Sequence, residues 1–65
     1  MQKLLKSYQL TDVSEYYDII VMSVINGQNK QSISQFKAMP KANQKDFIIN
    51  GNLTERQQQA FIMIL

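Results

Sequence analysis

One group of side chains that could do chemistry is a run of carboxylates. Asp12, Glu15 and Asp18 are spaced three residues apart, so a helix would place neighbouring pairs within one turn of each other. Such a pair could bind Mg²⁺ or share a proton in acid–base catalysis. Acidic residues at the start of a helix also cap free amides and favour the positive end of the helix dipole. We expect this structural role to explain all three carboxylates.

A second group is a lysine-rich segment, residues 30 to 45, which contains no acidic residue. Such a segment could bind phosphates or an acidic protein surface. Lysines that simply keep a small protein soluble are the competing interpretation. The candidate contacts to nucleic acid or to an acidic partner are Lys30, Lys37, Lys41, Gln44 and Lys45.

The composition excludes most other chemistry. The chain has no His and no Cys, which removes disulfides, thiol nucleophiles, the usual zinc sites and the commonest general base near neutral pH. It has only two glycines, Gly27 and Gly51, so it lacks a glycine-rich phosphate loop. We therefore expect no enzymatic activity, no catalytic residues, no cofactor and no metal site.

The length of 65 residues predicts a single small domain spanning residues 1–65. A domain of about this size buries only about 60% of its unfolded surface, so its net stability is marginal. Burial of an apolar face against a second copy or another protein would add stability, and we expect homo-oligomerisation or an obligate partner. No apolar run is long enough to span a bilayer and no signal peptide is evident, which predicts a cytoplasmic protein without membrane contact.

Apolar periodicity and capping residues favour helices. The two Asn-Gly pairs, at residues 26–27 and 50–51, follow apolar stretches, where glycine typically ends a helix. Asn-Gly also forms hairpin turns, which leaves an α+β fold as the alternative. The predicted helices cover about residues 13–26 (capped by Asp12, with Glu15 at capping-box spacing), 30–39 (capped by Asn29 or Ser32), 41–50, and the segment after Thr54, where Gln57 completes a capping box. The fold class is thus an all-α bundle of three to four short helices, with homodimerisation expected to complete its core.

Two short segments resemble parts of known families. Residues 53–61, Leu-Thr-Glu-Arg-Gln-Gln-Gln-Ala-Phe, resemble the opening helix of winged helix-turn-helix repressors such as the LexA family. In those families this helix packs in the core and contacts no bases, so a capped amphipathic helix explains the segment better. Residues 16–39 loosely resemble one tetratricopeptide-like helical hairpin, although Ser32 and Gln35 stand where small residues are usual.

Protein binding fits more of the chain than any other function. Met22 lies on the otherwise polar face of its predicted helix, and the chain ends in five apolar residues. The candidate interface residues are Tyr16, Tyr17, Met22, Phe61, Ile62 and Met63, although core packing also explains the tyrosines. The sequence predicts a small intracellular regulator or inhibitor that acts by binding a protein, of the kind that phages and mobile elements encode.

The alternative function is DNA or RNA binding by a helix-turn-helix-like unit. Residues 32–39 would form its first helix, 40–43 its turn and 44–50 its recognition helix. Gln44 and Lys45 are residue types that contact base edges and phosphates.

Overall fold

The computed structural model describes all 65 residues and consists of five α-helices with no strand. The helices are α1 (Gln2–Ser7), α2 (Val13–Ile25), α3 (Asn29–Lys37), α4 (Lys41–Asn50) and α5 (Glu55–Ile64). The all-α prediction is confirmed, and the four predicted helices are present within two residues of their expected ends. Helix α1 was not predicted, because it is only six residues long and its N-cap residue, Met1, makes no side-chain capping bond.

The capping residues explain where α2 and α5 begin. The Asp12 side chain accepts a hydrogen bond from the Ser14 amide at 3.0 Å. At α5, the amide of Gln57 donates to Oγ1 of Thr54, and the Thr54 amide donates back to Oε1 of Gln57, which completes the predicted capping box. The equivalent box at α2 does not form, because Glu15 accepts instead from the Thr11 hydroxyl at 3.3 Å.

Helix α3 begins earlier than its expected serine cap. Its N-cap is Gln28, which makes no side-chain capping bond, and Ser32 and Gln35 lie buried inside the helix. The Ser23 hydroxyl donates to Oε1 of Gln35 at 2.9 Å, and the Tyr16 hydroxyl donates to the Gln35 carbonyl at 2.7 Å. Gln35 therefore holds α2 against α3, while the Ser32 hydroxyl donates within α3, to the Asn29 carbonyl.

The two glycines end their helices for different reasons. Gly27 has φ of +74°, the left-handed conformation predicted for a glycine after a helix. Gly51 has φ of −86°, and the positive φ occurs one residue later, at Asn52. Gly51 is required instead by space, since a Cβ there would overlap the Phe47 carbonyl and lie 2.8 Å from the Phe47 ring.

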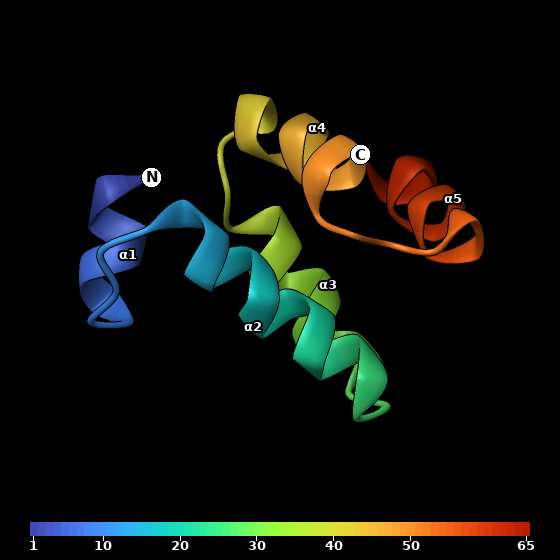
Figure 1. Cartoon of the computed structure of the whole chain (residues 1–65), viewed down its shortest axis with the longest axis horizontal. Coiled ribbons are helices and arrows are strands. Elements are labelled where there is room, and N and C mark those ends of the chain that lie inside the picture. The colour runs from blue at the N-terminus through green and yellow to red at the C-terminus, as the bar shows by residue number, and fades with distance from the viewer.

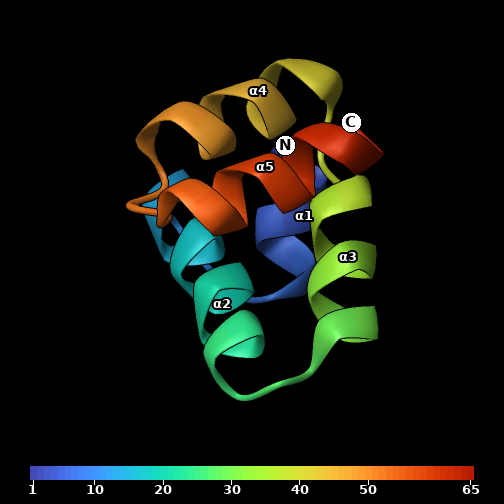
Figure 2. The ribbon, with the colours of Figure 1, turned by 90° about the vertical axis from the view of Figure 1, so that its right-hand side faces the viewer.

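The helices are arranged as two antiparallel pairs with α1 at one side. Helices α2 and α3 pack against each other, and α4 packs against α5. In Figure 1 the α2–α3 pair lies below the α4–α5 pair, with α1 beside α2. Figure 2 shows α4 and α5 running across one end of the α2–α3 pair.

Aromatic rings join the two pairs at the centre of the fold. Phe36 of α3 lies 4.8 Å from Phe61 of α5 and 5.9 Å from Phe47 of α4, measured between ring centroids. Tyr17 of α2 lies 5.2 Å from the Phe47 ring. Each of these four helices thus contributes one ring, in edge or tilted geometries that aromatic pairs prefer. Leu5 of α1 extends this core toward the N-terminus.

Candidate functional site

Half of the predicted interface residues belong to the core. Tyr16 is fully buried, and Tyr17 and Phe61 are at most 6% exposed. Their rings fill the space between helices, and the two tyrosine hydroxyls are already hydrogen-bonded to other helices. The structure therefore corrects the sequence assignment for the two tyrosines, whose side chains present no surface to a partner, while Phe61 keeps only a small exposed part at the edge of a cleft described below.

The other predicted interface residues are exposed. Met22 is 53% exposed on α2, while Ile62 and Met63 are 48% and 86% exposed on α5. Ile62 and Met63 are offset by 100° around α5, and Met22 lies on a different helix. Their role at an interface stays a prediction.

Burial affects the ionisation of the two core tyrosines. Removal from water, together with the nearby Tyr8, raises the pKa of Tyr16 to about 12. Burial and the hydrogen bond to Asp46 also raise the pKa of Tyr17. Both hydroxyls therefore stay protonated at neutral pH and act as hydrogen-bond donors, which is a structural role.

The carboxylates of the first group do not converge. Asp12 caps α2, Glu15 accepts from Thr11, and Asp18 is exposed on the same helix. No three acidic, histidine or cysteine side chains lie together as a group that could hold a metal ion. The capping role predicted for Asp12 is confirmed.

The lysine-rich segment spreads over α3, the turn at Pro40 and α4. Lys30, Lys37 and Lys45 are exposed, while the Lys41 ammonium group donates to the main-chain oxygen of Leu65 at 3.1 Å. Gln44, predicted to contact bases or an acidic partner, is instead 5% exposed.

The burial of Gln44 has a specific cause. Its Nε2 donates to the Met39 carbonyl at 2.8 Å and lies 3.5 Å from the Lys37 carbonyl, so it satisfies the free end of α3. This corrects the sequence assignment, because a helix-turn-helix that uses Gln44 for base contacts would have to break this bond. The sequence spacing could have predicted this burial. Gln44 lies three and four residues before Phe47 and Ile48, so it shares the helix face that points into the core.

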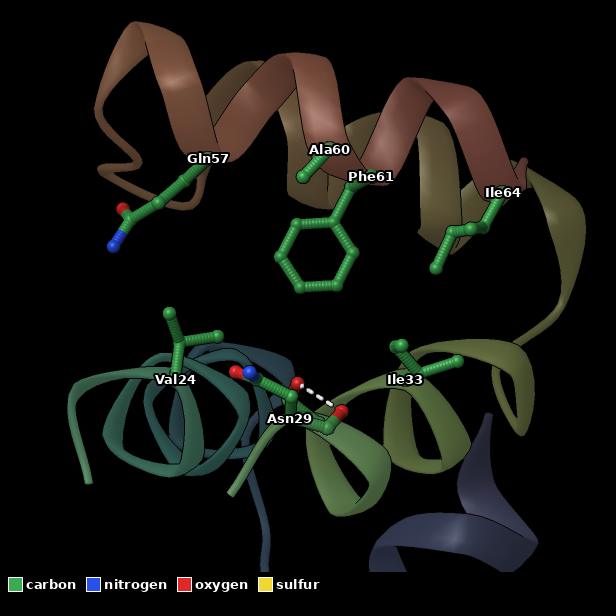
Figure 3. A pocket seen from close by; sticks show the side chains of 8 residues that line it. Val24, Asn29, Ile33, Gln57, Ala60, Phe61 and Ile64 are labelled. Carbon is green, nitrogen blue, oxygen red and sulfur yellow. Dashed lines mark hydrogen bonds between the residues drawn. The ribbon is translucent and has the colours of Figure 1, made fainter. Parts of the chain in front are cut away.

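The main concave site lies where the two helix pairs meet. It is a cleft of about 320 Å³ between α5 on one side and the ends of α2 and α3 on the other. Figure 3 shows Gln57, Ala60, Phe61 and Ile64 of α5 pointing toward Val24, Asn29 and Ile33. Five of the eight lining residues are hydrophobic, and the polar ones are Asn29, Ser32 and Gln57.

Only Phe61 among the cleft residues was a predicted site residue. Ile33 is 37% exposed at the cleft. Ala60 is also exposed, and Val24 and Ile64 are half-buried. Their positions follow from how the α4–α5 pair crosses the α2–α3 pair, which periodicity within one helix does not reveal.

No helix of the chain is long and apolar enough to cross a lipid bilayer. In comparisons with known proteins, the sequence matches no family model, and it has no significant match among curated proteins or solved structures.

Proposed function

We propose that this protein acts by binding another protein, whose activity it regulates or inhibits, and that the partner docks in the cleft between α5 and the α2–α3 pair. The observation that supports the proposal is the open apolar lining of the cleft, which is formed by Val24, Ile33, Ala60 and Ile64. In so small a chain, apolar side chains that stay partly exposed at a concave site are candidates for burial by a partner. Burial of such surface contributes about 25 cal/mol per Å² before the costs of association.

The exposed surface around the cleft enlarges the candidate interface. Met63, 86% exposed, lies three residues after Ala60 and therefore on the adjoining edge of α5. Ile25, 66% exposed, follows Val24 at the end of α2. This surface includes Met63 from the predicted interface set and replaces the buried tyrosines with residues that a partner can reach. Met22 lies on the opposite side of α2 from Val24, and Ile62 on the far side of α5 from Ala60, so neither belongs to it.

A matched pair of isoleucine variants tests the proposal. Ile33→Asp puts a charge into the cleft, whereas Ile49→Asp makes the same change on the outer side of α4, where the side chain is 73% exposed. Both side chains are exposed enough for the helices to tolerate the change, which circular dichroism checks. The tagged wild type and both variants are used for quantitative capture from lysate of the source cells, with and without nuclease.

The proposal predicts a stoichiometric protein that survives nuclease, is retained by Ile49→Asp and is reduced at least tenfold by Ile33→Asp. Capture that is equal for the two variants would show that the cleft is not the docking site. Capture that disappears with nuclease would instead favour the nucleic-acid alternative, with Lys30, Lys37, Lys41 and Lys45 as the residues to map.

A further inference from the structure

The rim of the cleft is basic. On α3, Lys30 and Lys37 lie three residues before and four residues after Ile33, so the three side chains share one face of the helix. Both lysines are exposed, and α3 contains no acidic residue. Ile33 lines the cleft, so the two cations flank its α3 wall.

Helix α5 repeats this arrangement on the opposite wall. Arg56 lies four residues before Ala60 and is exposed at the start of the cleft. The one acid of this helix, Glu55, is offset by 100° around the helix from Arg56 and lies farther from Ala60. Cations therefore flank the cleft on its α3 and α5 walls.

The third wall, from α2, carries no charge near the cleft. Residues 19 to 25 of α2 are uncharged, and the last acidic residue, Asp18, lies six residues before Val24. Six residues of helix correspond to a rise of about 9 Å. Three cations thus flank the apolar cleft, and none of the residues that line it is acidic.

We infer, on the basis of the proposed function, that the partner segment is an amphipathic helix with a short apolar stripe flanked by acidic residues. Between Gln57 and Ile64 the α5 wall runs for about 10 Å, roughly two helical turns. This length and the volume of about 320 Å³ suit apolar side chains at positions i and i+3 or i+4 of a docked helix. Carboxylates beside that stripe then face Lys30, Lys37 and Arg56, which fixes the orientation of the helix and accelerates association.

The test uses two stapled helical peptides with the same leucine stripe, one flanked by glutamates and the other by lysines. Binding to the full chain is measured by fluorescence polarisation at low and high salt. The acidic peptide is expected to bind about tenfold more tightly than the basic one, because a few contacts to the rim cations each contribute modestly to the binding free energy. This preference is expected to shrink at high salt, which screens the charges.

Two triple charge reversals separate a local rim effect from net charge. The cleft variant carries Lys30→Glu, Lys37→Glu and Arg56→Glu. The matched control carries Lys3→Glu, Lys6→Glu and Lys45→Glu, on exposed positions outside the cleft walls, and changes the net charge by the same amount. The preference for the acidic peptide is expected to disappear or reverse in the cleft variant and to persist in the control.

Each other outcome overturns the inference and leaves the proposed function to its own capture experiment. Equal binding of the two peptides, with sensitivity to Ile33→Asp, would keep the cleft but exclude the acidic helix. Equal loss in both triple variants would mean general charge attraction, and no binding of either peptide would exclude this class of ligand. A dimer of the free chain that Ile33→Asp dissociates would identify a second copy as the occupant.

Discussion

The hydroxyl of Tyr17 donates a 2.7 Å hydrogen bond to Oδ2 of Asp46 and so joins α2 to α4. The other oxygen of this carboxylate accepts from the Asn50 side-chain amide at 2.7 Å. The Tyr17 ring simultaneously packs on Phe47 in the core. One side chain therefore links the α2–α3 pair to the α4–α5 pair both by a polar contact at the surface and by an aromatic contact inside. The cleft exists only while the two pairs keep this relation.

Removal of the Tyr17 hydroxyl should destabilise the fold. We expect Tyr17→Phe to lower the free energy of unfolding by about 1–2 kcal/mol, because a hydrogen bond to a charged acceptor is lost while the ring stays in place. Urea denaturation followed by circular dichroism measures the change. In an Asp46→Ala background the same substitution should cost less, and fully additive costs would contradict the bond.

The same contact predicts a dependence of stability on acid. Hydrogen bonds from Tyr17 and Asn50 hold the pKa of Asp46 below its usual value of 3.8. Since the pKa is lower in the folded than in the unfolded chain, the contribution is complete above about pH 4 and is lost as the pH falls through the lowered pKa. Melting temperatures across this range should fall less steeply for Asp46→Asn than for the wild type. The same change of melting temperature with pH in both proteins would show that Asp46 does not contribute to the acid dependence.

Tyr16 predicts a second dependence, in alkali. Because burial raises its pKa from 10.0 to about 12, the folded chain keeps Tyr16 protonated where the unfolded chain releases the proton. Its stabilising contribution is therefore complete below about pH 10 and is lost as the pH rises toward 12. Tyrosinate absorbance should show a late ionisation that coincides with loss of helical circular dichroism. Tyr16→Phe should reduce the amplitude of that late step, and the remainder belongs to Tyr17, whose pKa is also raised. An unchanged amplitude in this variant would contradict the assignment.

The two glycines should differ in their response to alanine. Gly51→Ala forces a Cβ against the carbonyl and ring of Phe47, and we expect it to cost about 1–3 kcal/mol through overpacking of the core. Gly27→Ala has no neighbour within 4 Å and should cost about 1 kcal/mol from its left-handed backbone alone. Near-ultraviolet circular dichroism should report a disturbed aromatic core for Gly51→Ala only. An unchanged aromatic signal in that variant would contradict the close contact.

The sequence predicted most of the fold because its helix boundaries are local. Pro40 and Gly51 bracket α4 at the predicted residues, and Thr54 with Gln57 sets the start of α5. The prediction failed where contacts distant in sequence determine the structure. Ser32 resembles a helix cap, yet it is buried inside α3, on the side where Gln35 accepts a hydrogen bond from Ser23 of α2.

The candidate site was less predictable than the fold. Tyr16 and Gln44 have residue types that suit interfaces, but each is buried because its polar group bonds to the backbone of another segment. Conversely, Ile33 and Ala60 are 27 residues apart in sequence and meet across a cleft that only the crossing of the two pairs creates. Helical periodicity identifies the face of each residue within its own helix but not the neighbour that the face will meet.

An NMR titration of the isotope-labelled chain with the acidic amphipathic peptide tests the central claim most directly. If the cleft is the docking site, the amide signals of Val24, Ile33, Ala60 and Ile64 shift together and saturably, while those of Ile49 and Lys45 on the outer part of α4 stay in place. Shifts confined to α4, or the same shifts in the Ile33→Asp variant, would contradict the claim that the partner binds between α5 and the α2–α3 pair.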